Sequence, residues 1–131
     1  MILSRRYVLG GGLALACLPR HALAAQPLTP ADWLSGWLAA FNDPGGAAYP
    51  DFVRRNIPNL APYLEEDLGV REASGGLVLL RGEQTAPREI TAWVRDRNWD
   101  RFSKVVLSIG DNTIDDLSFT GAPAPPGFAV R

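Results

Sequence analysis

The amino-acid sequence predicts an α+β fold in which three N-terminal helices pack on a curved, four-stranded antiparallel sheet. Residues 31–73 carry apolar side chains three and four positions apart, which is the spacing of one helix face. Residues 77–120 carry them at every second position instead, as half-buried strands do. Within that part, the polar residues 96–100 separate two β-branched segments, 90–95 and 104–109, and predict a central hairpin with a solvated tip.

The first helix has the clearest start. Thr29 is a good capping residue, Pro30 suits the first helical position, and an acid follows two residues later. Two large aromatic residues, Trp33 and Trp37, belong to its apolar face, where they are expected to be core or to contact a ligand. The polar and turn-forming residues 42–46 end the helix.

The remaining elements are predicted from the same spacings. A short second helix is expected at residues 50–55. A third is expected to start at residue 59, to bury Tyr63, to leave the acids at 65–67 in solvent, and to end at Gly69 or after residue 73. Four strands are expected at residues 77–83, 90–95, 104–109 and 113–120.

Residues 1–24 are predicted to be a signal peptide. Arg5 and Arg6 precede an apolar run that is too short to span a bilayer, and Ala22 and Ala24 form a small-residue cleavage site. The paired arginines resemble a twin-arginine export signal, which implies recognition by the twin-arginine export machinery. We therefore expect a periplasmic or secreted bacterial protein cut after Ala24. The alternative is an ordinary signal peptide in which the arginines supply only charge.

Cleavage at this site would remove the single cysteine, Cys17, and the single histidine, His21. We expect Cys17 not to be lipidated, because Ala14 stands where a lipoprotein signal usually has leucine. The remaining chain could form no disulfide, no thiolate metal site and no histidine-based catalytic triad. No catalytic residue, metal or cofactor is therefore predicted.

The charge balance disfavours two classes of partner. The whole chain has 13 basic and 14 acidic residues, and three of the basic ones lie in the predicted signal peptide, which leaves 10 against 14 and a net charge of −4. A mildly acidic domain is a poor candidate for nucleic-acid binding, which depends on neutralising phosphates. The domain also lacks a basic face for a membrane surface, and no stable membrane insertion is expected.

Three segments carry a resemblance to a known family. They are WLSGWLAAFN at residues 33–42, GGLVLLR at 75–81 and VRDRNWDRF at 94–102. They resemble the nuclear transport factor 2-like (NTF2-like, or SnoaL-like) domains, and more narrowly the version that precedes serine β-lactamase-like hydrolases and tail-specific peptidases in exported bacterial proteins. The resemblance implies a cone fold over residues 31–120, after a leader at 25–30. It also implies that the Pro-rich tail at 121–131 takes the place of the connection to a hydrolase, so that the chain is an accessory domain without its enzyme.

The expected function is that of a non-catalytic binding or interaction domain. The resemblance implies a small hydrophobic ligand, or a partner subunit that is either a second copy in a homodimer or a separate hydrolase. The alternative is a cone-fold isomerase or cyclase that uses acids and tyrosines, which the missing histidine disfavours. The candidates for contact with a ligand or partner are Trp33, Trp37, Tyr63, Trp93, Arg95, Trp99 and Asp115. The residues available to an enzyme are Tyr49, Tyr63, Arg81, Glu83, Arg95, Asp115 and Asp116.

The candidate contact residues in the strands are assigned to faces by the alternation of side chains along a strand. Trp93 and Arg95 are expected to share one face of the central strand, where an aromatic ring beside a guanidinium can hold an anionic ligand or another protein. Trp99 at the hairpin tip is expected to mark a contact surface or to fold back on the sheet. Asp115 and Asp116 are expected to face opposite sides of the last strand.

Overall fold

The computed structural model describes residues 28–128. The predicted export residues Arg5, Arg6, Ala22 and Ala24, together with Cys17, lie outside this range. Within it, the order of elements is α2 (Pro30–Phe41), α3 (Ala48–Asn56), the 3-10 helix η3 (Pro58–Tyr63), α4 (Leu64–Ser74), β1 (Leu77–Ala86), β2 (Glu89–Asp96), β3 (Phe102–Ile109) and β4 (Ile114–Ala122). The prediction of an α+β fold with three α-helices and a four-stranded antiparallel sheet is confirmed.

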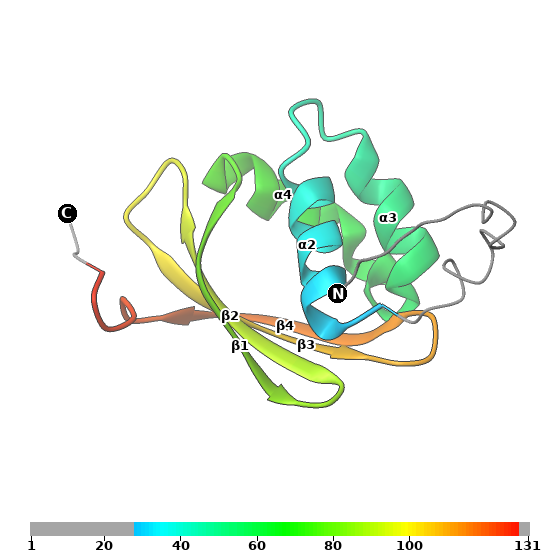
Figure 1. Ribbon diagram of the computed structural model, residues 1–131. Helices are drawn as coiled ribbons and strands as arrows, with labels where there is room; N and C mark the ends of the chain where they lie inside the picture. The colour runs from blue at the N-terminus through cyan, green and yellow to red at the C-terminus, as the bar shows by residue number, and fades with distance from the viewer. Residues whose placement is uncertain (1–27, 129–131) are drawn as a thin grey trace, which may run out of the picture.

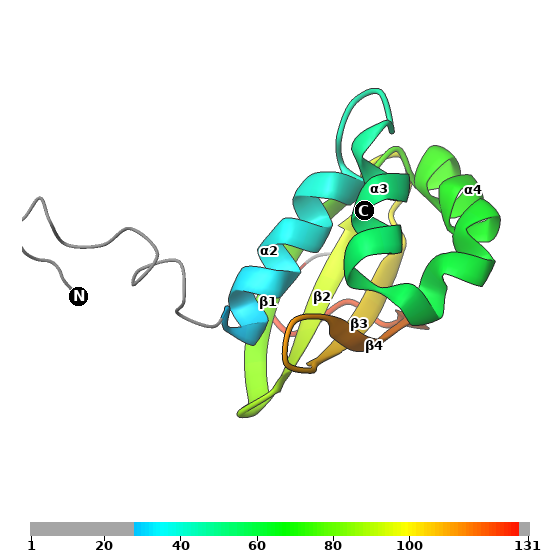
Figure 2. The same cartoon turned by 90° about the vertical axis from the view of Figure 1, so that its right-hand side faces the viewer.

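The helices lie on one face of the sheet, as Figures 1 and 2 show. The strands follow one another in the order β1-β2-β3-β4, and each pair is antiparallel. The central hairpin pairs Ala92 with Val105 and Trp93 with Lys104, so the predicted turn is in the right place. Irregularities in β1 and β4 break the regular register and increase the local twist of the sheet. The last strand runs to Ala122, so the first residues of the expected tail belong to the sheet.

The core forms where α2 and α3 meet the inner face of the sheet. Val94 and Leu107 of the central strands are fully buried against this layer, as is Trp37 of α2. The aromatic rings of the helices pack on one another, with centroids of Trp37 and Phe41 5.3 Å apart and those of Phe41 and Tyr49 5.2 Å apart in an edge-on contact. This aromatic cluster forms one wall of the candidate site.

The predicted start of the first helix is confirmed. The Thr29 hydroxyl accepts a hydrogen bond from the Asp32 backbone N–H at 3.1 Å, and the Asp32 carboxylate accepts one from the Thr29 backbone N–H at 2.9 Å. The two bonds satisfy donors that the first helical turn would otherwise leave without partners. Pro30 occupies the first helical position, where its missing N–H has no cost.

The third predicted helix is split, and the expectation that it buries Tyr63 is wrong. Residues Pro58–Tyr63 form a 3-10 helix, and the α-helix begins only at Leu64. Pro62 lies inside the 3-10 segment, where it has no N–H to donate and disfavours a regular α-helix. The helical phase changes at this junction, so Tyr63 is 58% exposed rather than buried.

The hairpin tip contacts the end of the last helix, α4, so the tip is only partly solvated and not fully solvated as expected. The backbone N–H of Asn98 donates to the Ser74 carbonyl at 2.9 Å, and the Trp99 indole N–H donates to the Ala73 carbonyl at 3.0 Å. Trp99 remains 58% exposed. Asp96 is buried, and its carboxylate accepts from the Arg101 guanidinium at 3.0 and 3.1 Å. The two hydrogen bonds to the carbonyls of Ser74 and Ala73 hold the C-terminal end of α4 against the hairpin.

We expect the Gly75→Ala variant to be less stable than the parent and Gly69→Ala to be more stable. Gly75 has a φ of +71°, and a Cβ there would come within 2.6 Å of the Asn98 side chain. A left-handed alanine costs about 1–2 kcal/mol, whereas alanine at Gly69, inside α4 with open space around it, gains about 0.5–1 kcal/mol. Urea unfolding of both variants measures the difference, and shifts of the same sign would contradict this account.

Candidate ligand-binding site

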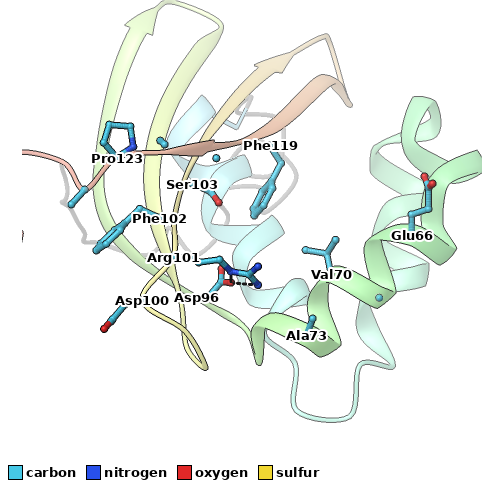
Figure 3. Close-up of a pocket in the computed structure, with 14 residues that line it drawn as sticks. Glu66, Val70, Ala73, Asp96, Asp100, Arg101, Phe102, Ser103, Phe119 and Pro123 are labelled. Atoms are coloured by element: carbon cyan, nitrogen blue, oxygen red, sulfur yellow. Dashed lines mark hydrogen bonds and ion pairs between the residues drawn. The ribbon is translucent and has the colours of Figure 1, made fainter. Parts of the chain in front are cut away.

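A wide groove separates α4 from the adjoining ends of β3 and β4. Its volume is about 1000 Å³. Val70 and Ala73 project from α4 toward the sheet, where Ser103 and Phe119 face them across the groove (Figure 3). The small side chains of this part of α4 leave the space between helix and sheet unfilled. The lining residues that carry charge are Glu66, Asp96, Asp100 and Arg101.

A smaller recess adjoins the groove and leads toward the core. It has a volume of about 180 Å³, and Val70 and Phe119 line both spaces. The recess takes residues from all three helices, from η3 and from β4. The complete lining is Trp37, Phe41, Tyr49, Leu60, Asp67, Val70, Leu117 and Phe119. Groove and recess together form an apolar space with few polar groups, which is the usual character of a small-molecule site.

The polar groups of the recess form one chain of hydrogen bonds. The indole N–H of Trp37 donates to the Tyr49 hydroxyl at 3.3 Å, and this hydroxyl donates to the Asp67 carboxylate at 3.5 Å. Tyr49 is only 1% exposed. Its position in the first turn of α3, directly after the chain turns back from α2, brings the ring against Phe41. The chain therefore joins α2, α3 and α4 through a single phenol.

Burial sets the protonation of these groups. It raises the pKa of the Tyr49 hydroxyl well above its usual range, so the phenol stays protonated and remains a donor. Burial also raises the pKa of the Asp67 carboxyl, while the hydrogen bond from Tyr49 opposes this shift and the negative charge of Glu66 adds to it. Asp67 is the one charged side chain that lines the recess.

The structure brings only one of the predicted contact residues into this site, namely Trp37. Trp33 is partly buried on α2 and packs against the core. Trp93 and Arg95 do share a face of β2, since the residues that alternate with them, Ala92 and Val94, belong to the core on the other face. Neither Trp93 nor Arg95 lines the groove or the recess.

The residues on the outer face of β2 contact charged side chains of neighbouring segments. The Arg81 guanidinium lies 5.1 Å from the ring centroid of Trp93, and Arg95 contacts Asp100 at 3.8 Å. Asp115 and Asp116 are both exposed, so the expectation that they face opposite sides of the strand is wrong. The cause is the irregular pairing of β4 at this point, where Ile109 pairs with Ile114 rather than continuing the register. The Asp115 carboxylate accepts from the Thr113 hydroxyl at 3.1 Å.

The most informative site residue, Asp67, was expected to lie in solvent. Its carboxylate instead lines the recess and is half-buried. The sequence does contain a signal for this position, because Asp67 follows the buried Leu64 by three residues and therefore shares its helix face. Tyr49 was identified only as a residue available to an enzyme, because a single tyrosine in a short helix gives no sign of its partners.

No family model, curated protein or solved structure matches the chain. Among residues 28–128, no helix is long and apolar enough to cross a membrane. The same part of the chain contains no group of three or more His, Cys, Asp or Glu side chains that could hold a metal ion. The site itself is therefore the basis for a functional assignment.

We expect Tyr49→Phe to destabilise the domain and Tyr63→Phe to leave its stability nearly unchanged. Loss of the Tyr49 hydroxyl leaves the buried Trp37 N–H and the Asp67 carboxylate without this partner, at a cost of about 1–2 kcal/mol. Tyr63 is exposed, so its hydroxyl can be replaced by water with a change within about 0.5 kcal/mol. Denaturant unfolding of both variants tests this, and equal effects would contradict the structural role of Tyr49.

Proposed function

We propose that the chain is a non-catalytic binding domain that holds a small hydrophobic ligand in the groove and recess beside α4. The observation that carries this proposal is that the two spaces adjoin each other, since Val70 and Phe119 line both. The recess provides aromatic walls and one polar pair, and the groove provides room for the rest of a molecule. Apolar walls with a few fixed polar groups favour binding of such ligands.

The proposed fold family and location rest on the sequence resemblance. An NTF2-like cone is supported by the arrangement of helices over one face of an antiparallel sheet around an apolar space. Export by the twin-arginine machinery is supported by Arg5 and Arg6 ahead of the apolar run. A partner subunit, either a second copy or a separate hydrolase, is a further proposal, supported by the aromatic and charged side chains on the outer face of the sheet.

An isomerase or cyclase is the second candidate, and the contact between Tyr49 and Asp67 favours it. A half-buried carboxylate with a raised pKa is suited to accept a proton, and a phenol can polarise a carbonyl. The residues that would carry this chemistry are Asp67 and Tyr49, because Tyr63 and Asp115 lie outside the recess. Turnover of a molecule recovered from the protein would establish this candidate in place of binding alone.

We expect Val70→Trp to weaken the binding of a neutral apolar probe at least about tenfold, which is a loss of about 1.4 kcal/mol. Val70 lies between groove and recess, so an indole there occupies the ligand space. The matched control is Glu65→Trp, on an exposed position of the same helix that lines neither space. Titration with N-phenyl-1-naphthylamine, followed by the fluorescence of the probe, measures the dissociation constants. Equal affinities of the two variants and the parent would place the binding elsewhere.

We expect Arg5→Lys with Arg6→Lys to leave the uncut precursor in the cytoplasm. The twin-arginine receptor reads the guanidinium pair, whereas lysines preserve only the charge. Cell fractionation and the intact mass report location and cleavage after Ala24. Arg20→Lys, outside the pair, is the matched control and is expected to be exported. Normal export of the double variant would instead support the ordinary signal peptide.

A further inference from the structure

Asp67 is a half-buried carboxylate that forms no ion pair with a cationic side chain of the described part of the chain. Its carboxylate accepts a hydrogen bond from the Tyr49 hydroxyl at 3.5 Å. Removing a carboxylate from water without a counter-charge is costly, so a positive charge brought by a ligand would find a favourable position here.

The walls around Asp67 suit the same kind of charge. The rings of Trp37, Phe41, Tyr49 and Phe119 line the recess together with its carboxylate. Aromatic faces carry negative potential and attract ammonium groups, most strongly where water is excluded. Aliphatic substituents on the nitrogen would at the same time bury apolar area against these rings.

The charges that line the groove do not oppose a cation. Asp96 forms an ion pair with Arg101 at 3.0 Å (Figure 3), and Asp100 contacts Arg95 at 3.8 Å. The remaining charged residue of the lining, Glu66, is acidic. A carboxylate at this position attracts cations and repels anions during approach.

From this geometry we infer that the ligand is a hydrophobic amine, with its ammonium group in the recess against Asp67 and its apolar body in the groove. The inference rests on the proposed function, because it names the chemical class of the ligand for the same site. The aromatic walls and the Asp67 carboxylate select a cation over a neutral or anionic molecule of the same shape.

Two compounds of equal shape test the inference. They are the phenethyltrimethylammonium cation and its neutral carbon isostere, (3,3-dimethylbutyl)benzene. Equilibrium dialysis against the parent protein measures the binding of each compound directly. We expect the cation to bind about tenfold more tightly, since a desolvated cation–aromatic contact and a carboxylate act together.

The outcomes separate the inference from the proposed function. Equal binding of the two compounds, or tighter binding of the neutral one, overturns the amine and leaves a hydrophobic-ligand site in place. Binding of neither compound overturns both. The comparison on the parent protein decides this without any variant.

A pair of variants then tests whether Asp67 causes the preference for the cation. Asp67→Asn keeps an oxygen that can accept from Tyr49 and removes the charge, so the preference for the cation is expected to disappear. Asp116→Asn, an exposed position on β4, removes an equal charge and is expected to retain the preference. If Asp67→Asn, folded by circular dichroism, keeps the full preference, the carboxylate is not the recognition group.

Discussion

The buried hydroxyl of Tyr49 is the constraint on which the arrangement of the helices depends. A phenol that is 1% exposed must keep its hydrogen bonds, because water cannot replace them. Its two partners, Trp37 and Asp67, come from different helices, so α2, α3 and α4 meet at this point. The same contact requires α4 to present a carboxylate inward, which gives the recess its charge.

The groove stays open because α4 is fixed mainly near its C-terminal end. There the hairpin tip binds the last carbonyls of the helix, and Arg71 donates from its guanidinium to the carbonyls of Phe41 and Asp43 at the end of α2. The middle of α4 faces the sheet with Gly69 and Val70, which are too small to reach it. The anchored C-terminal end and the unfilled middle of α4 together leave the groove open.

Local signals in the sequence predicted the helices and strands well, but they did not predict the contacts between residues that are distant in the sequence. The cap at Thr29 and the hairpin at residues 90–109 follow from short-range chemistry, and both are present. Pro62 is a local signal for a break in the third helix, and the change from 3-10 to α-helix there leaves Tyr63 exposed. The contact of Trp99 with Ala73 joins residues 26 positions apart, and no local pattern encodes it.

The candidate site was predicted less well, because its contacts also join residues that are distant in the sequence. Of its aromatic walls, Trp37 was identified because a helix period marked it, whereas the roles of Tyr49 and Asp67 depend on a contact across 18 positions. An acid beside two other acids, as Asp67 is, has the local pattern of a solvated helix face. Only the packing of α4 against the other helices separates it from Glu65, which is exposed.

The protonation of the recess supports the proposal of a binding site over that of an isomerase or cyclase. The raised pKa of Tyr49 keeps the phenol neutral and therefore unable to act as a base, so Asp67, whose pKa burial also raises, is left as the one group in the recess suited to accept a proton. An isomerase usually needs an acid and a base that reach the same substrate, and here the phenol already donates to the carboxylate. A fixed acceptor surrounded by aromatic rings needs no proton transfer to hold an ammonium group, because the charge is complementary in the ground state.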